Sequence, residues 1–323
     1  MADSSAGRVA EGKRRSFWVD AGIRLVKEKP LGAVGAVITL LLLLTGIFAN
    51  FLAPYGMNEV GAGPRLIGPS AKFWLGTDNL GRDILTRIIY GARISVIVGL
   101  SASALATFLS VVIGIISGYL SGKFDLFMQR FIDGWLCLPP LIILMLIISV
   151  IGAGMWPIII IMGIGGGIGS TRLIRSAVIA IRENVYVKAA EAIGCTTSRI
   201  LTQHILPNIM ATIIILFSIS VPSMIMGEAS LSFLGFGIPA PFPSWGSMLT
   251  GSARTYMFES PWMAIWPGLA LSIVVYGVNM FGDALRDILD PRLRGGVGRY
   301  GVRRAKKEAA KNKATKETGS FPR

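Results

Sequence analysis

Five runs without a single Asp, Glu, Lys or Arg constrain this 323-residue chain more than any other feature of its sequence. They are residues 30–58, 94–122, 134–171, 200–227 and 260–282. A bilayer core is about 30 Å thick and is crossed by about 20 apolar residues of helix, so each run is long enough to cross it. The third run is too long for one crossing, and Gly152, Gly154 and Pro157 indicate a reverse turn near its middle. The sequence therefore predicts six transmembrane helices.

The composition agrees with an all-α membrane protein, because 15% of the residues are charged and 52% are hydrophobic, whereas a soluble domain carries about 25% charge. The six helices are predicted at residues 31–53, 94–120, 126–150, 155–178, 209–234 and 262–284. The first is too long, and begins too far along the chain, for a cleaved secretory signal, so we expect it to be retained. Gly114 and Gly118 have the spacing that lets two helix backbones approach closely, within this chain or against another membrane subunit.

The basic residues predict the orientation, because Lys and Arg beside a transmembrane helix are retained in the cytoplasm. With the N-terminus inside, all but six of the 32 Lys and Arg residues are cytoplasmic; the exceptions are Arg65, Lys72, Arg82, Arg87, Arg93 and Arg254. We therefore expect both termini in the cytoplasm. The predicted parts of the chain are an N-terminal segment (1–30), the first helix (31–53), an external loop (54–93), a five-helix core (94–284) and a basic tail (285–323).

The sequence offers little material for catalysis or metal binding. It has no phosphate-binding loop of the form GxxxxGK[ST], and its one histidine is His204. Cys137 and Cys195 are far apart and form no CxxC pair, which favours ordinary thiols over a disulfide or a zinc site. We expect no catalytic residue, no metal and no cofactor in this chain. The basic tail is expected to contact anionic membrane lipid, not nucleic acid.

The most informative polar stretch lies between the fourth and fifth predicted helices. Residues 186–193 are good helix formers, and Gly194 suits a left-handed cap. Thr197 is placed to start a second short helix that Pro207 would end. The first helix carries Ala189, Ala190 and Ala192, so one of its faces is flat enough to lie in a groove of another protein. A purely structural turn is the alternative interpretation.

This stretch resembles the cytoplasmic EAA loop of ABC-transporter permeases, EAA-x3-G-x9-I-x-LP. Lys188 replaces the acidic residue, His204 occupies the isoleucine position, and Glu191, one turn further on, is a candidate substitute for the missing acid. The resemblance implies that residues 182–208 couple the chain to an ATPase. The coupling residues that it implies are Tyr186, Lys188, Ala189, Ala190, Glu191, Gly194, Leu206 and Pro207.

Three more segments narrow the resemblance to the oligopeptide, dipeptide and nickel branch of these permeases. Residues 75–83 (LGTDNLGRD) resemble its GTDxxGRD segment, which is typical of the second, C-type permease. Residues 228–237, followed by Pro-Ser-Trp-Gly at 243–246, resemble its signature in the fifth helix. Residues 282–294 resemble its exit from the last helix.

The resemblance implies a type I ABC importer permease that crosses the bacterial cytoplasmic (inner) membrane several times. Such a chain pairs with a homologous B-type permease, two ATP-binding subunits and an extracytoplasmic substrate-binding protein. ATP and magnesium are expected on the partner subunits, so this chain would be no enzyme. Peptides are the expected substrate, with nickel, glutathione or glycosides as alternatives. A channel or ion-coupled carrier that works alone is the rival from another class, but it would favour several buried carboxylates or histidines.

The remaining candidate residues lie in the external loop and in the fifth helix. The external-loop residues Gly76, Thr77, Asp78, Gly81, Arg82 and Asp83 are expected to hold the loop in shape, or else to contact the binding protein or the partner permease. Arg82 and Asp83 are candidates to pair with each other. Glu228 and Ser232 are candidates for the translocation path, with a hydrogen bond between helices as the alternative. Pro139 and Pro140 should kink the third helix, and Cys137 should be buried within it.

Overall fold

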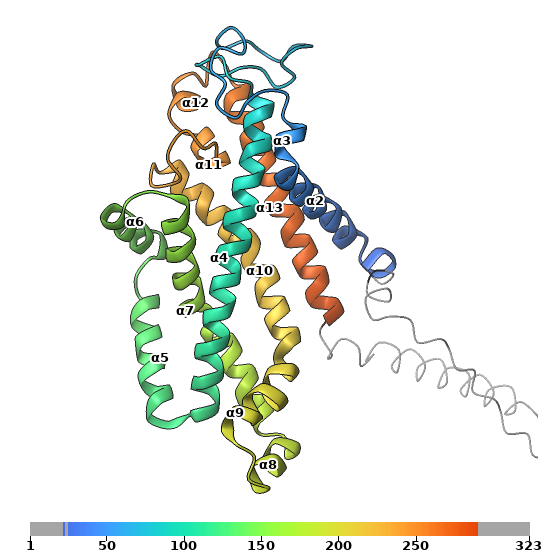
Figure 1. Ribbon diagram of the computed structural model, residues 1–323, viewed down its shortest axis with the longest axis vertical. Helices are drawn as coiled ribbons and strands as arrows, with labels where there is room; N and C mark the ends of the chain where they lie inside the picture. Colours follow the sequence, from blue (N-terminus) through green and yellow to red (C-terminus); the bar gives the residue numbers. More distant parts are fainter. Residues whose placement is uncertain (1–21, 23–24, 290–323) are drawn as a thin grey trace, which may run out of the picture.

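The computed structural model describes Gly22 and residues 25–289. The regular elements of this part of the chain are all helices, joined by loops, with one isolated bridge between Thr77 and Asp83. The predictions for residues 1–21 and for the tail from residue 290 onward fall outside it. Its long helices form one bundle (Figure 1): α2 (Pro30–Ile47), α4 (Ile84–Leu120), α7 (Met155–Arg182), α10 (Leu206–Phe233) and α13 (Trp262–Leu289). Each of the five belongs to a helical run long and apolar enough to cross a membrane.

The third predicted helix is broken into two. Helix α5 (Gly122–Leu136) and helix α6 (Pro140–Ile151) meet at an angle of 86°, and they give a sixth crossing only when the bent pair is counted as one. Pro140 begins α6, where its missing N–H costs no hydrogen bond. The kink expected at Pro139 and Pro140 is therefore confirmed in stronger form, as a break.

The short helices lie at the two ends of the bundle (Figure 1). At one end are α8 (Val185–Ala192), α9 (Thr197–Arg199) and the π-helix η1 (Ile200–Ile205). At the other end are α11 (Trp245–Met248) and α12 (Ser252–Thr255), beside the loop that leads from α3 (Ala49–Leu52) into α4. We call these the α8 end and the α11 end.

Helix α4 begins at Ile84, within the segment predicted as a loop. Asp83 caps it, because its Oδ2 atom accepts hydrogen bonds of 2.7 Å from both the backbone N–H and the hydroxyl of Thr86. Arg87 and Arg93, which the sequence analysis places in the external loop, belong to this helix. The Arg93 guanidinium in fact donates to the carbonyl oxygen of Gly46 at 2.9 Å, so its charge is held against α2.

Helix α10 also differs from the prediction, because Pro207 does not end a helix. It stands in the first turn of α10, where a missing N–H is tolerated, and the helical run continues from Thr197 through η1 to Phe233. The segment after Gly194 is therefore a direct extension of a membrane-length helix. A movement of this segment would be passed along α10.

Helices α4 and α7 pack tightly against each other, and glycines make the approach possible. A Cβ atom at Gly114 would lie 2.8 Å from the Cβ of Ile174, and one at Gly118 would lie 2.9 Å from the Cβ of Val178. Any side chain at either position would push the two helices apart. The predicted spacing of small residues thus serves packing within this chain.

Candidate functional site

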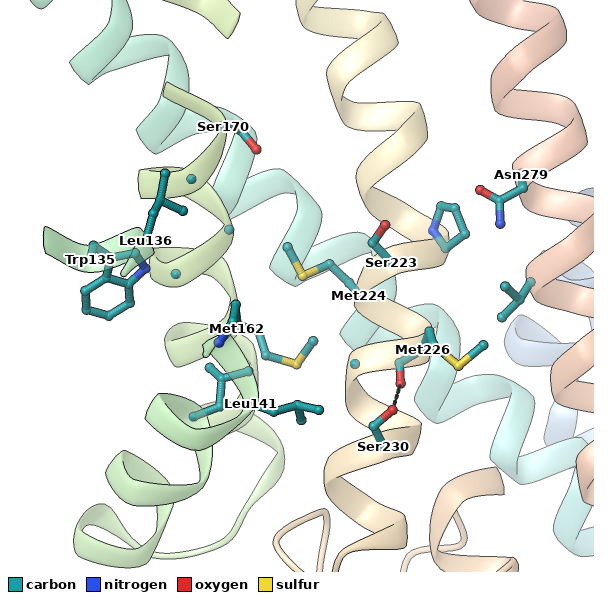
Figure 2. Close-up of a pocket in the computed structure, with 18 residues that line it drawn as sticks. Trp135, Leu136, Leu141, Met162, Ser170, Ser223, Met224, Met226, Ser230 and Asn279 are labelled. Atoms are coloured by element: carbon teal, nitrogen blue, oxygen red, sulfur yellow. Dashed lines mark hydrogen bonds between the residues drawn. The ribbon is translucent and has the colours of Figure 1, made fainter. Parts of the chain in front are cut away.

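An open cavity of about 740 Å³ lies between two groups of helices. Helices α5, α6 and α7 form one wall, and α10 and α13 form the other (Figure 2). Trp135, Leu141 and Met162 lie on the first side, and Met224, Met226 and Asn279 lie on the second. No lining residue is charged. The cavity therefore offers shape and a few polar groups but no fixed charge to a solute.

Methionines and glycines together shape this cavity. A Cβ atom at Gly166 would lie 2.5 Å from the Cε of Met224, and one at Gly227 would lie 2.7 Å from the Cε of Met162. The glycines thus leave room for the ends of flexible methionine side chains. Methionine has three rotatable bonds and a polarizable sulfur, so such a wall can adapt to solutes of different shape.

The polar side chains of the cavity are Ser170, Ser223 and Ser230, with their hydroxyls, Trp135, with its indole N–H, and Asn279, with its amide. The hydroxyl of Ser223 donates to the carbonyl oxygen of Ile219 at 3.3 Å, and that of Ser230 donates to Met226 at 2.8 Å (Figure 2). Both serines are therefore satisfied by their own helix and leave the wall nearly apolar. The side chain of Asn279 on α13 is exposed and remains the group best suited to hydrogen-bond a solute.

Glu228 and Ser232, the two residues predicted on the translocation path, do not line this cavity. Their side chains are buried, and the Ser232 hydroxyl donates to Oε1 of Glu228 at 2.6 Å. They lie where the chain after α10 packs closely, since a Cβ at Gly237 would meet Ser232. This arrangement gives no support to a place on the translocation path. This hydrogen bond joins two residues of α10, so it is not the bond between helices that was the alternative, and Oε2 of Glu228 is buried without a hydrogen-bond partner among the described residues.

Sequence reasoning missed the residues that do line the cavity. Asn279 was the detectable one, because a polar amide in an otherwise apolar membrane helix is expected to face protein or water. The run Gly165, Gly166 and Gly167 was a second signal, since so many glycines in one helix need a neighbour that fills the space. Trp135 gave no signal of its own, because its position depends on the break between α5 and α6.

At the α8 end, the short helix α8 packs on its own chain through one face. Val187 and Ala190 are buried in a cluster with Ile200 and Ile205 of η1. Gly194 follows the helix with φ of +80°, which confirms the predicted left-handed cap. Beyond this cap the chain turns directly into α9 and η1.

The opposite face of α8 is exposed and largely apolar. Val185 and Ile193 are 84% and 81% exposed, and Tyr186 and Ala189 lie exposed on the same helix. The structure therefore corrects one part of the flat-face prediction. Ala190 is 6% exposed and faces its own chain, so Ala189 and Ala192 are the small residues of α8 that a partner could contact.

Polar contacts tie α8 to the rest of the bundle. The Lys188 ammonium lies 2.7 Å from Oε2 of Glu183, and this contact holds the pKa of Glu183 below its usual range. Oε1 of Glu191 accepts a hydrogen bond of 3.0 Å from the hydroxyl of Tyr119 on α4. Glu191, the proposed substitute for the missing acid, is thus already engaged within the chain.

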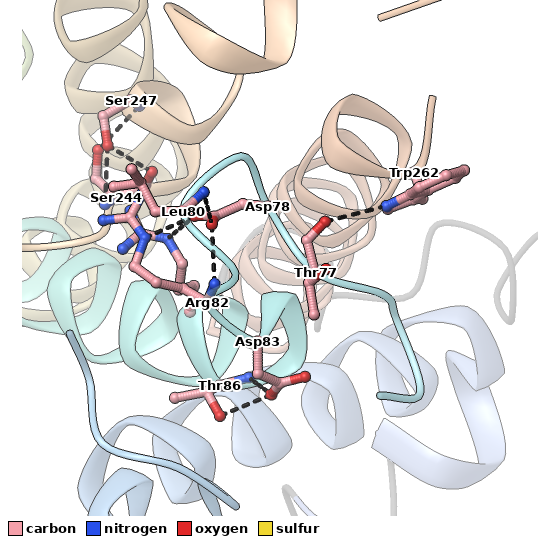
Figure 3. Close-up of polar contacts among 10 residues, drawn as sticks. Thr77, Asp78, Leu80, Arg82, Asp83, Thr86, Ser244, Ser247 and Trp262 are labelled. Atoms are coloured by element: carbon pink, nitrogen blue, oxygen red, sulfur yellow. Dashed lines mark hydrogen bonds and ion pairs between the residues drawn. The ribbon is translucent and has the colours of Figure 1, made fainter. Parts of the chain in front are cut away.

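The loop at the α11 end is held by the residues of the GTDxxGRD segment (Figure 3). The Oδ1 atom of Asp78 accepts the backbone N–H of Leu80 at 2.8 Å and that of Arg82 at 3.0 Å, and its Oδ2 accepts Nε of Arg82 at 2.6 Å. Gly76 and Gly81 have φ of +86° and +70°, which side chains rarely adopt. These contacts fix the path of the loop.

Two further contacts involve Thr77: one is within the loop, and the other attaches the loop to α13. The hydroxyl of Thr77 donates to the carbonyl oxygen of Pro64 at 2.7 Å, and the indole N–H of Trp262 donates to the carbonyl oxygen of Thr77 at 3.3 Å. Arg82 and Asp83 do not pair with each other. Arg82 pairs with Asp78, and Asp83 caps α4, because the backbone turn points the two neighbouring side chains in different directions.

The two cysteines differ from each other in exposure. Cys137, expected to be buried within a continuous third helix, is exposed because it stands at the break between α5 and α6. Cys195 is partly buried beside α8. The described residues contain no group of three or more His, Cys, Asp or Glu side chains that could hold a metal ion.

Family comparisons cover most of the chain. Residues 110–295 match the model of the binding-protein-dependent transport system inner membrane component. Residues 16–69 match the N-terminal transmembrane domain of oligopeptide transport permease C. A solved structure of the MetNI methionine ABC transporter, in an inward-facing conformation, is 18% identical with a TM-score of 0.49, over 64% of this chain and 98% of that chain.

Curated relatives extend over nearly the whole chain. The oligopeptide transport system permease protein OppC of Bacillus subtilis is 39% identical over 87% of this chain and 92% of its own length. The dipeptide transport system permease protein DppC of the same organism is 38% identical over 86% and 87%, respectively. The glutathione transport system permease protein GsiD of Pectobacterium atrosepticum is 34% identical over 87% and 93%. The chain therefore belongs to the binding-protein-dependent transport permeases, in the branch of the oligopeptide and dipeptide permeases C.

Proposed function

We propose that this chain is the C-type permease of a type I ABC importer and forms half of a translocation path for peptides. The observation that carries the proposal is the uncharged, methionine-lined cavity between helices α5, α6 and α7 on one side and α10 and α13 on the other. A peptide importer must accept side chains of either sign. A wall without fixed charge does not reject them, while Asn279 can bond the peptide main chain that all such solutes share.

The proposed assembly has the parts that the family requires. A homologous B-type permease would complete the path, two ATP-binding subunits would hold ATP and magnesium, and an extracytoplasmic binding protein would deliver the peptide. Both termini and the α8 end would face the cytoplasm of the bacterial inner membrane. An exposed apolar stripe on α8 and its C-cap supports this orientation, because an ATPase subunit could bind it in a groove. The stripe consists of Val185, Ala189 and Ile193.

The proposed mechanism is alternating access. Closure of the ATPase subunits on ATP would move α8, and the movement would reach the cavity through η1 and α10, which form one helical run. The cavity wall contributed by Met224 and Met226 lies on this same helix. A shift at the α8 end would therefore change the shape of the cavity directly.

The test is ATP-dependent peptide uptake by the reconstituted complex. Proteoliposomes should contain both permeases and both ATPase subunits, with the binding protein outside and a radiolabelled tripeptide as substrate. We expect uptake that stops when the ATPase subunits cannot hydrolyse ATP. Uptake that persists without the ATPase subunits would identify a channel or carrier. Uptake of nickel or a glycoside instead of peptide would refute the proposed substrate.

A further inference from the structure

A second, smaller pocket at the α11 end contains an arginine, Arg87, that forms a long ion pair with Asp78 but has a buried N–H group without a hydrogen-bond acceptor. Its volume is about 180 Å³, and Asp78, Arg82, Arg87, Ser247 and Thr250 are among its lining residues. It shares no lining residue with the large cavity. It therefore lies away from the wall that would hold a transported solute.

Arg87 is the unusual residue of this pocket. Its side chain is 11% exposed, and its Nη1 atom is buried without a hydrogen-bond partner among the described residues. A guanidinium group has five N–H donors, and leaving them unpaired away from water is costly. The Nη1 atom of Arg87 therefore needs a hydrogen-bond acceptor, and the described part of the chain does not supply one.

The nearby carboxylate of Asp78 does not fill this role. Its two oxygens are engaged with Leu80 and Arg82, and the shortest approach of its Oδ2 to Nε of Arg87 is 3.9 Å. That separation is too long for a hydrogen bond. Figure 3 shows Asp78 hydrogen-bonded to Arg82 within the loop, and Ser247 of α11 is among the lining residues of the pocket.

The charges around the pocket define the missing acceptor. The pocket is lined by two positive side chains, Arg82 and Arg87, and one negative side chain, Asp78. Its net charge is therefore +1, which a single carboxylate neutralises. A carboxylate also matches the two-pronged geometry of a guanidinium group. A doubly charged phosphate fits less well, because it would meet the Asp78 carboxylate. The hydroxyl of Thr250 lies in the pocket wall as a further donor.

We propose that this pocket receives an Asp or Glu side chain of the extracytoplasmic binding protein when that protein docks on the α11 end. The proposal rests on the proposed function for the orientation of the chain. Three observations favour a docked side chain: the pocket is small, it lies at the end of the bundle opposite α8, and it is separate from the cavity. Arg87 would then form an ion pair with that side chain and so position the binding protein over the translocation path.

The test uses the complete complex in lipid nanodiscs, with the equilibrium affinity for the binding protein as the readout. Thr250→Asp puts a carboxylate of the chain itself beside Arg87, and Thr250→Asn is its uncharged control of the same shape. We expect Thr250→Asp to weaken docking by about tenfold or more and Thr250→Asn to leave it near the wild-type value. Because Thr250→Asp adds a partner for Arg87, thermal stability should not fall.

Variants of Arg87 test the same site by removing its positive charge instead of adding a negative one. Arg87→Gln should weaken docking about as much as Thr250→Asp, and the affinity that remains should depend less on salt concentration. Arg87→Lys should keep part of the affinity and part of its salt dependence, because lysine keeps the charge but not the guanidinium geometry. Arg254→Gln, at an exposed arginine of the same end, is the control and should have little effect. Equal affinity in Thr250→Asp and Thr250→Asn would overturn the proposal.

A different source of the carboxylate gives a different result. If the pocket held the terminal carboxylate of the transported peptide, Arg87→Gln would abolish the preference for free-acid over amidated peptides and leave docking unchanged. That result would also overturn the proposal. Because docking is measured without transport, the inference can fail while ATP-dependent peptide uptake, the test of the proposed function, still succeeds.

Discussion

The hydroxyl of Tyr119 on α4 donates a hydrogen bond of 3.0 Å to Oε1 of Glu191 on α8. The Arg182 guanidinium lies over the Tyr119 ring, 5.4 Å from its centroid, and its Nη1 donates to the hydroxyl of Ser121 at 2.8 Å. Three helices thus meet around one aromatic ring. A displacement of α8 would pull on α4 and on the turn that leads into α5, one wall of the cavity.

We expect Tyr119→Phe to weaken coupling and leave folding nearly intact. The substitution keeps the ring and its contact with Arg182 but removes one hydrogen bond, which is worth about 1 kcal/mol. The number of peptides imported per ATP hydrolysed should therefore fall, while the unfolding temperature changes little. Tyr276→Phe, at an exposed tyrosine of α13, is the matched control. An unchanged ratio in Tyr119→Phe would show that this contact does not transmit motion.

Ala189 and Ala190 should respond differently to the same substitution. Ala189→Arg projects a charge from the exposed face of α8 and should reduce co-purification of the ATPase subunits without destabilising the permease. Ala190→Arg forces a charge into the cluster with Ile200 and Ile205, so it should lower the unfolding temperature of the permease itself. The checks are co-purification and thermal unfolding of the solubilised protein. Loss of ATPase binding in Ala190→Arg alone would place the docking face on the other side of α8.

The left-handed cap at Gly194 allows a test of backbone strain without steric interference. No atom lies within 4 Å of a Cβ built at this glycine, so a substitution acts through φ alone. Gly194→Val should cost about 1–2 kcal/mol of local stability, and Gly194→Asn should cost less, because asparagine tolerates this conformation. Amide hydrogen exchange of α8 should rise in the same order. Equal protection in both variants would mean that the cap does not hold α8 in place.

Exchanging Arg82 and Asp83 should not restore the stability that either single charge reversal removes. Arg82→Asp breaks the pair with Asp78, whereas Asp83→Arg removes the cap of α4, at a cost of about 1 kcal/mol. The double variant exchanges the two residues but restores neither contact. Its unfolding temperature should therefore fall at least as far as in the worse single variant. Recovery in the double variant would show that the two side chains pair with each other in the membrane.

The sequence predicted the elements that depend on local chemistry. The charge-free runs located the long helices, Gly194 located the left-handed cap, and the two prolines located the break after α5. The errors came from residues whose meaning depends on contacts that are distant in the sequence. Arg87 and Arg93 looked like loop residues until their neighbours at the α11 end and on α2 were known. Ala190 looked like its neighbour Ala189, since only the packing on η1 separates the buried from the exposed alanine.

The candidate site was harder to predict because its walls come from four separate stretches of chain. Glu228 drew attention as the one carboxylate of its helix, yet it is buried, accepts a hydrogen bond from Ser232 and does not line the cavity. The residues that face the cavity, such as Met224 and Asn279, are individually ordinary for a membrane helix. Their shared position follows from how α10 and α13 face the broken pair α5 and α6. No spacing within one helix reveals that arrangement.

Ser223 and Ser272 give a matched test of the cavity itself. Both hydroxyls donate to the carbonyl oxygen four residues earlier, at 3.3 Å to Ile219 and 2.8 Å to Gly268, so phenylalanine removes the same kind of bond from each helix. Ser223 lines the cavity, whereas Ser272 lies on an exposed face of α13.

Ser223→Phe should therefore fill part of the cavity and reduce peptide uptake severalfold, most strongly for the bulkiest peptides, because the lost space excludes them first. Ser272→Phe should leave uptake close to the wild-type rate. ATP hydrolysis stimulated by the binding protein should persist in both variants, since neither position lies near α8 or the α11-end pocket. Equal uptake by the two variants, across peptides of increasing size, would mean that the solute does not pass through this cavity.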